Sequence, residues 1–232
     1  MNRFLKGAMI LTIAGVIVKI IGAFSKVLVA RILGGEGIGL YMMAYPIYQI
    51  IVSISAAGIP VAISIMIAEK LANRDMRGVQ QVFNVSLRVL TLVGIIFSVG
   101  LYASAEWLIK WNIITDSRAL IPIQLLSPAI IVVTILSCFR GYFQGFQYMV
   151  PTGTSQVFEQ IFRVGSMVGL AYYFIDSGLH LAAGGATFAT FPGVLAGLIV
   201  RVYFYRSQRS LRQQMLSEQN EEAPIERTSA VI

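Results

Sequence analysis

The stretch Gly15-Val-Ile-Val-Lys-Ile-Ile-Gly-Ala-Phe-Ser-Lys-Val-Leu-Val-Ala-Arg31 predicts a membrane-spanning helix that carries charge within it. At about 1.5 Å per residue, residues 7–30 would span roughly the 30 Å hydrocarbon core of a bilayer. Lys19 and Lys26 lie inside this run, and a lysine at the bilayer centre costs about 2.5 to 3.5 kcal/mol on insertion scales. Because their spacing equals two helical turns, both lysines share one helix face. This placement indicates a polar cavity that holds an anionic group.

Composition places the whole chain among integral membrane proteins. Of its 232 residues, 56% are hydrophobic and 12% are charged, and the mean hydropathy is +0.75. Soluble domains carry about 25% charged residues. The net charge of +7 would suit a nucleic-acid-binding protein, but the basic residues lie mostly in short segments between apolar runs, which is typical of membrane topology. We therefore expect bilayer lipids, and no nucleic acid, as partners.

Six apolar runs approach the length of a membrane-crossing helix. They cover residues 7–30, 41–68, 83–105, 119–138, 153–175 and 181–205. The second run contains Pro46 and Pro60, which predict a bent or tilted helix. The sequence thus predicts an all-α integral membrane fold, with a bundle of six transmembrane helices over residues 1–210.

The distribution of basic residues predicts the orientation of this bundle. One side of the membrane receives Arg3, Lys6, Lys70, Arg74, Arg77, Arg140, Arg206, Arg209 and Arg212, and the other receives Arg31, Lys110 and Arg118. Since cytoplasmic segments carry the excess of Lys and Arg, we expect the N-terminus and the C-terminus in the cytoplasm. Residues 211–232 carry several glutamates and few large apolar groups, so they are expected to form a polar cytoplasmic tail or a truncated linker.

The lysines of the first helix are the main candidate binding residues. Lys19 lies too deep in the predicted helix to reach the interface easily, and charges at that depth are usually functional. Lys26 lies nearer the external end, where two interpretations stay open: a cavity residue, or a lysine whose stem extends to the interface. Two cations on one face would suit a carboxylate, a phosphate or a pyrophosphate.

The fifth run adds the polar stretch Ser155-Gln-Val-Phe-Glu-Gln-Ile-Phe-Arg163. Glu159 and Arg163 are separated by one helical turn and share a face. One interpretation is a structural ion pair that holds helices together. The other is a coupling role, in which Glu159 binds a proton or meets the lysines across the cavity. With both lysines, this pair leaves two net positive charges, which favours an anionic cargo.

The sequence contains no motif that indicates a metal site or a catalytic site. Cys138 and His180 are the only residues of their kinds, so disulfides and histidine-ligated metal centres are not expected. The glycine-rich stretch 34–39 does not match a nucleotide-binding motif and is interpreted as a turn. We expect no enzyme, no catalytic residue, no metal and no cofactor.

Three stretches carry a family resemblance. They are Leu33-Gly-Gly-Glu-Gly-Ile-Gly-Leu-Tyr41, Ala57-Gly-Ile-Pro-Val-Ala-Ile-Ser64, and Arg140-Gly-Tyr-Phe-Gln-Gly-Phe-Gln-Tyr-Met-Val-Pro151, which runs on into the polar stretch of the fifth run. In this order and spacing, they resemble the polysaccharide-transporter branch of the MOP flippase superfamily, the group of stage V sporulation protein B, YtgP and MurJ-like proteins.

The resemblance implies a flippase of the bacterial cytoplasmic membrane that moves an undecaprenyl-pyrophosphate-linked sugar by alternating access between two lobes. The chain is similar to the amino-terminal lobe, so a second lobe or a second copy of the chain is an expected partner. In such relatives, arginines of the first helix line the cavity. Lys19 falls at one of these positions and Ser25, with Lys26 beside it, at the next. A role in sporulation or in general cell-wall synthesis is equally compatible.

Two other functions stay open. One is a MATE-like drug or cation antiporter, which would need a deep unpaired acid in the first helices that this sequence lacks. The other is a non-transporting membrane partner or scaffold protein, a half-transporter whose function would not depend on Lys19 and Lys26.

Overall fold

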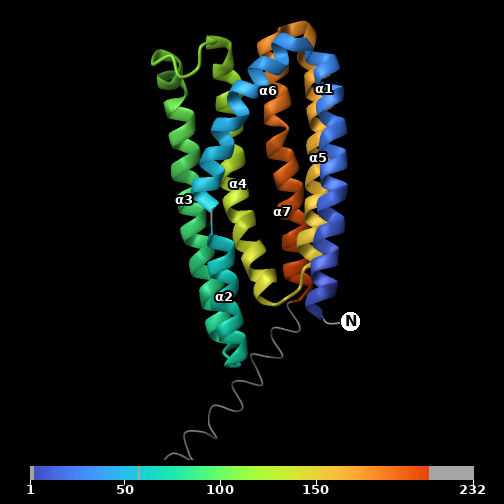
Figure 1. Ribbon diagram of the computed structural model, residues 1–232. Coiled ribbons are helices and arrows are strands. Elements are labelled where there is room, and N and C mark those ends of the chain that lie inside the picture. Colours follow the sequence, from blue (N-terminus) through green and yellow to red (C-terminus); the bar gives the residue numbers. More distant parts are fainter. Residues whose placement is uncertain (1–2, 57, 209–232) are drawn as a thin grey trace, which may run out of the picture.

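The computed structural model describes residues 3–56 and 58–208, and the fold over these residues is helical, as the sequence predicts. The helices are α1 (Arg3–Ala56), α2 (Ile59–Ala72), α3 (Met76–Lys110), α4 (Leu120–Gly145), α5 (Val150–Phe174), α6 (Leu179–Phe188) and α7 (Thr190–Ser207), with short 3₁₀ helices η1 (Ser117–Ala119) and η2 (Ile175–Ser177). They form one elongated bundle, with connections at its two ends (Figure 1). The expected tail, residues 211–232, lies outside the described residues.

Helix α1 consists of two helical halves that meet at Gly34. The φ and ψ of Gly34 are 66° and −176°, a non-helical conformation that glycine adopts readily because it lacks a Cβ. The first half, residues 3–33, rises along the bundle; the second, residues 35–56, runs back down towards α2 (Figure 1). The glycine-rich stretch therefore forms the turn that reverses α1.

Two of the expected helices are divided in the structure. The expected run 41–68 is interrupted beside Gly58, whose φ of 72° is left-handed, and α2 begins at the next residue. Pro60 lies in the first turn of α2, where its missing N–H costs no hydrogen bond. The expected run 181–205 is divided at Ala189 into α6 and α7. Apolar patterning missed both breaks because the residues on either side are equally apolar.

Helix α4 is the central element of the bundle, and it packs against α1, α2, α3, α6 and α7. Glycine allows the closest of these contacts. A Cβ at Gly141 or at Gly145 would lie 2.7 Å from the side chains of Ile63 and Ile67 of α2, respectively. Beside this contact, rings of α3, α4 and α7 pack together, among them Phe83, Phe139, Tyr142 and Tyr205. The core is thus built around the most buried helix.

Among the described residues, four stretches are long and apolar enough to cross a membrane. They are Leu5–Ala72, Met76–Lys110, Ser117–Gly145 and Leu179–Ser207. The first holds 68 residues and would extend about 100 Å if straight, so the reversal at Gly34 divides it into two passages. Helix α5 is not in this set because Gln, Glu and Arg interrupt its apolar residues. The number of crossings and the side of the termini stay predictions.

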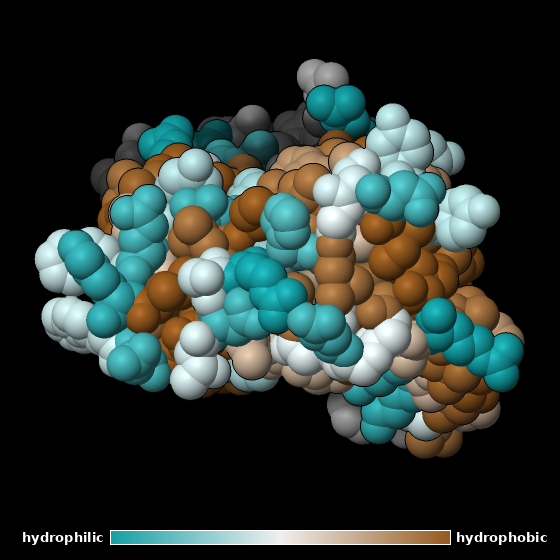
Figure 2. Space-filling view, turned by 90° about the horizontal axis from the view of Figure 1, so that it is seen from above, coloured by the Kyte–Doolittle hydropathy of each residue, from teal (hydrophilic) through white to brown (hydrophobic). Residues whose placement is uncertain are grey.

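The surface of the bundle is apolar along its length and polar at the end that carries the Gly34 reversal. Leu92, Ile96 and Val99 of α3 are among many large apolar side chains that are more than half exposed. Viewed from above, hydrophilic side chains cover much of the end surface (Figure 2). An apolar flank with polar ends is the distribution that a bilayer requires.

Arg118 joins two loops at this polar end. Its guanidinium pairs with Glu36, beside the reversal of α1, and with Asp116, before α4, each at 2.7 Å. The hydrogen bonds from Arg118 lower the pKa of the Asp116 carboxyl below its ordinary value. All three groups lie at the surface, so this contact positions loops and adds little stability.

Candidate functional site

Lys19 and Lys26 lie on one exposed face of the first half of α1, which we call the lysine face. Within the described residues, no carboxylate is at ion-pair distance from either ammonium group. Ser25 is placed differently: its side chain is buried, and its hydroxyl donates to the carbonyl of Gly22 at 2.7 Å. The structure therefore groups the two lysines and turns Ser25 into the bundle. Their role in binding stays a prediction.

The lysine face adjoins the polar side of α5. Gly22 lies between the two lysines at helical spacing, and a Cβ there would be 3.1 Å from Nε2 of Gln160. Two turns earlier along α5, a Cβ at Gly153 would lie 3.0 Å from Ile10 of α1. Small residues on both helices allow this close approach. The cationic residues of α1 thus lie beside the polar residues of α5.

The polar residues of α5 form a hydrogen bond in place of the expected ion pair between Glu159 and Arg163. Arg163 donates to Oε1 of Gln160, which is buried. Among the described residues, Glu159 and Arg163 do not form the expected ion pair, because the guanidinium turns to the amide instead. Glu159 is half-buried, and none of the residues that the structure describes forms an ion pair with it. Its coupling role stays a prediction.

Helix α7 packs on the same polar side of α5 through two glycines. A Cβ at Gly193 would lie 2.6 Å from Cβ of Arg163, and one at Gly197 would lie 3.3 Å from Cβ of Glu159. The spacing of these glycines, one helical turn apart, is the small-residue pattern that permits close helix contact in membranes. The backbone of α7 thereby encloses the charged residues of α5.

A cleft of about 340 Å³ opens beside Glu159, and we call it the arginine cleft. Its walls come from the end of α1, the start of α2, α4 and α5. They are formed by Val52, Ser53, Pro60, Val133, Leu136, Ser137, Arg140 and Glu159. Mostly apolar walls with a few convergent polar groups are typical of ligand sites.

Arg201 of α7 lies behind this cleft and was not singled out by the sequence patterns. It is fully buried, its Nε donates to Oγ of Ser155 at 2.8 Å, and its Nη1 donates to the carbonyl of Leu136 at 2.5 Å. Its Nη2 has no hydrogen-bond partner in the structure. The charges of Arg140 and Glu159 both act on this guanidinium. A lone arginine within an apolar run is itself the signal that would have found it.

Arg140 also differs from its expected place. The sequence suggests a loop residue after a helix that ends near residue 138, whereas α4 continues to Gly145 and Arg140 lies within it. Its side chain is half-buried and lines the arginine cleft, and its buried Nε has no hydrogen-bond partner among the described residues. The two arginines therefore carry unpaired donors inside the bundle.

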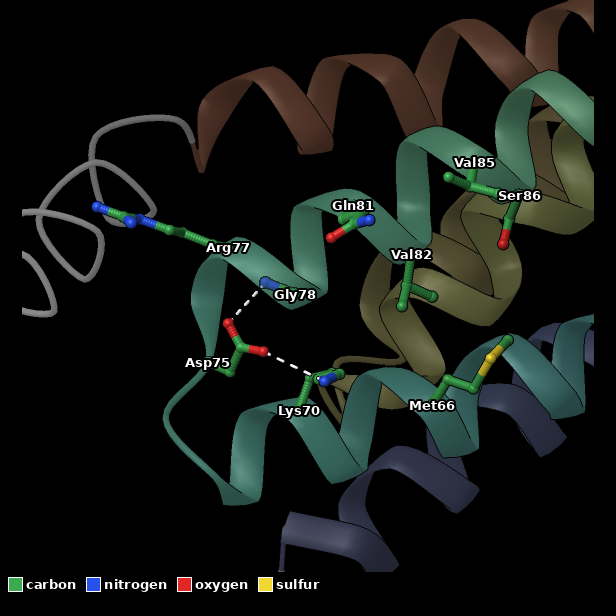
Figure 3. Close-up of a pocket in the computed structure, with 9 residues that line it drawn as sticks. All are labelled: Met66, Lys70, Asp75, Arg77, Gly78, Gln81, Val82, Val85 and Ser86. Atoms are coloured by element: carbon green, nitrogen blue, oxygen red, sulfur yellow. Dashed lines mark hydrogen bonds and ion pairs between the residues drawn. The ribbon is translucent and has the colours of Figure 1, made fainter.

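A second pocket of about 480 Å³ lies at the turn from α2 to α3 (Figure 3). Asp75 caps α3 by accepting from the N–H of Gly78 at 2.7 Å, and it pairs with Lys70 at 3.3 Å. Arg77 points away from this pair (Figure 3). Capping accounts for these polar groups, since an N-cap satisfies free N–H groups of the first helical turn. We therefore interpret this pocket as part of the turn that connects α2 to α3 and not as a ligand site.

A comparison of the sequence with known protein families identifies the family of this chain. The model of the polysaccharide biosynthesis protein family matches residues 4–222. The chain belongs to this family. It is thus a multi-pass bacterial membrane protein of the polysaccharide-transporter branch of the MOP flippase superfamily, as the resemblance in the sequence indicated.

Relatives and solved structures agree with this family. The chain is 34% identical to stage V sporulation protein B of Bacillus subtilis (strain 168), over 91% of this chain and 40% of that protein. It is 29% identical to the lipid II flippase MurJ of the same strain, over 90% and 40%. It thus spans about two-fifths of these relatives. An outward-facing multidrug resistance MATE family transporter of the MOP superfamily has the same fold, with a TM-score of 0.76, 16% identity, and coverage of 89% of this chain and 45% of that one.

Proposed function

We propose that this polysaccharide biosynthesis family member acts as the amino-terminal lobe of a flippase for undecaprenyl-pyrophosphate-linked sugars. The observation that carries the proposal is the lysine face, an exposed pair of cations on an apolar helix that form no ion pair with any carboxylate in the described part of the chain. The similarity to a lipid II flippase supports the same class of cargo. The required partner is a second lobe or a second copy of the chain.

The proposed topology has six crossings, at residues 7–30, 41–68, 83–105, 119–138, 153–175 and 181–205, with both termini in the cytoplasm. Helix α5 counts as a crossing despite its polar residues, because α1 and α7 pack on its polar side. The excess of basic residues at the end that holds the N-terminus supports the orientation.

In the proposed mechanism, Lys19 and Lys26 attract the pyrophosphate of the lipid while its tail stays in the bilayer. An ammonium group is a compact point charge and does not form the bidentate contacts of arginine, so the lysines guide the headgroup without fixing its orientation. Rocking of the two lobes then exposes the sugar on the external side. This transport needs no covalent chemistry.

The alternative function for a protein of this fold is a drug or cation antiporter. In that case Glu159 would be the acidic residue that binds the cation. The positive charges of Arg140 and Arg201 beside the arginine cleft disfavour that role, because they would repel a cationic drug. The flippase proposal instead uses Lys19 and Lys26 of the lysine face to attract an anionic cargo.

The test is transport and binding of a fluorescent pyrophosphate-linked lipid by the purified chain in proteoliposomes. We expect the double variant Lys19→Ala/Lys26→Ala to lose binding by about tenfold or more, since two charges near an anion are removed. Lys110→Ala, an exposed lysine at the end of α3, is the matched control and should bind as the wild type. Unchanged binding in the double variant would contradict the proposed site. Binding without flipping would show that two copies of this chain do not suffice and that a separate second lobe is needed.

A further inference from the structure

The two tryptophans of the chain lie together at one end of α3 and have no part in the proposed flippase mechanism. Trp107 and Trp111 are 60% and 69% exposed, and their rings meet edge to face with centroids 5.9 Å apart. Among the described residues, neither indole N–H donates a hydrogen bond. Tryptophan is a large apolar side chain with one polar atom, and it is mostly buried in soluble proteins. The pair therefore points to a partner that is apolar on one side and polar on the other.

The turn after α3 holds this pair in a fixed place. The N–H groups of Ile113 and Ile114 donate to the carbonyl of Leu108 at 3.0 and 3.1 Å. Ile114 is buried in the core of the bundle, whereas Ile113 is 62% exposed. Trp107, Trp111 and Ile113 thus form one exposed apolar surface, which we call the tryptophan patch.

The charges of α3 place this patch relative to the hydrocarbon core of the bilayer. Arg88 and Glu106 are both exposed, and no charged residue lies between them. Eighteen helical residues extend about 27 Å, which is close to the roughly 30 Å thickness of the core. The exposed side chains within this stretch include Leu92, Ile96 and Val99, which suit lipid tails. The patch begins at the next residue, Trp107, and so lies at the boundary of the core.

Helix α5 provides a second group of exposed aromatic side chains at the same end of the bundle. Tyr172 and Tyr173 lie in its last turn, and both are more than half exposed. Helices α3 and α5 lie on opposite sides of the bundle, and their last turns are at the same end (Figure 1). Tryptophan and tyrosine are enriched where a membrane meets water, because their rings are apolar and their polar atoms reach the headgroups. Aromatic residues on both flanks therefore mark one level, and a local contact of α3 does not explain them.

From these observations we propose that the tryptophan patch binds the headgroup region of the bilayer phospholipids. The indole N–H groups donate to ester or phosphate oxygens of the lipids, and the rings pack on the upper parts of the acyl chains. Trp111 lies one helical turn beyond Trp107, about 6 Å along the axis, so it is the closer of the two to water. The inference rests on the membrane location of the chain and does not depend on its cargo.

A second lobe or a second copy is the competing occupant of the patch. The lysine face, which such a partner would share, lies on the first half of α1, on the other side of the bundle from α3 (Figure 1). The apolar stretch of α3 below the patch has the length of the hydrocarbon core, which is a property that lipid requires and a protein partner does not. Phospholipid is therefore the occupant that the structure favours.

The experiment uses tryptophan fluorescence, because the chain has two tryptophans and both belong to the patch. Trp111→Phe and Trp107→Phe each leave one emitter, and both proteins are placed in phospholipid proteoliposomes. Lipids brominated on the upper part of the acyl chain should quench most of the emission of either variant, and lipids brominated near the chain end should quench little. Iodide in the water should quench Trp111 more than Trp107. The double variant Trp107→Phe/Trp111→Phe measures the background from tyrosine.

Three outcomes would overturn the proposal. Quenching by iodide without quenching by brominated lipids would place the patch in water. Quenching by neither would show that protein covers the patch, as a second lobe or a second copy would do. Stronger quenching by bromine near the chain end would place the indoles inside the hydrocarbon core. Lys19→Ala/Lys26→Ala should not alter the quenching, so this proposal and the flippase proposal fail independently.

Discussion

The lysine face of α1 and the arginines at the cleft are both cationic, yet they differ in burial and in hydrogen bonding. Lys19 and Lys26 are exposed, and within the described residues they contact no carboxylate. Arg201 is fully buried and donates to two other helices. The same sign of charge therefore serves two purposes: the exposed cations are available to a partner molecule, whereas the buried one is part of the packing. The predictions below separate these purposes.

The largest expected effect is the loss of stability on removing Arg201. Arg201→Ala takes away hydrogen bonds to α4 and α5 and leaves a cavity in the core, so the free energy of unfolding should fall by about 3 kcal/mol or more. Thermal unfolding of the purified protein measures this. Arg206→Ala, an exposed arginine one and a half turns further along α7, is the matched control and should change little. Equal stability of the two variants would show that Arg201 is not a structural contact.

A smaller effect is expected at the contact between α7 and α5. Gly193→Val places a branched side chain where even a Cβ would lie 2.6 Å from Arg163, so the unfolding free energy should fall by about 1 to 3 kcal/mol. Gly165→Ala is the control, since a Cβ at that glycine of α5 meets nothing within 4 Å. Unfolding in denaturing detergent compares them. A Gly193→Val protein as stable as Gly165→Ala would contradict the close packing of the two helices.

The fold was predictable where the helices are continuous and apolar. The expected runs 7–30 and 83–105 lie inside α1 and α3, because their length and hydropathy have no competing signal. The breaks beside Gly58 and at Ala189 were not predicted, since glycine and alanine are also common within membrane helices. These breaks depend on how the helices pack, which short-range patterns do not describe.

The candidate site was predictable in part for a similar reason. Lys19, Lys26 and Glu159 stand out because they are charges in apolar runs. Arg163 donates to Gln160 and not to Glu159, the partner that one of the two interpretations gave it. Spacing along one helix shows which groups can meet and not which neighbours compete for them. Gln160, one residue from Glu159, provides the observed acceptor. Arg140 was missed because its burial arises from contacts between helices that are distant in the sequence. Arg201, in contrast, is a charge in an apolar run and carried the same signal as Lys19.

The central claim is that α1 carries a cationic cargo site. Its most direct test changes the charge at residue 19 by chemical modification of a single variant. Lys19→Cys should bind the pyrophosphate-linked lipid more weakly than the wild type. Attachment of an aminoethyl group to the introduced thiol restores a positive charge and should restore binding, whereas attachment of a sulfonatoethyl group should not. The wild-type chain treated with the same reagents is the control, because its Cys138 is buried. Binding that is unaffected by Lys19→Cys, or that is restored equally by both reagents, would contradict a cationic cargo site on α1.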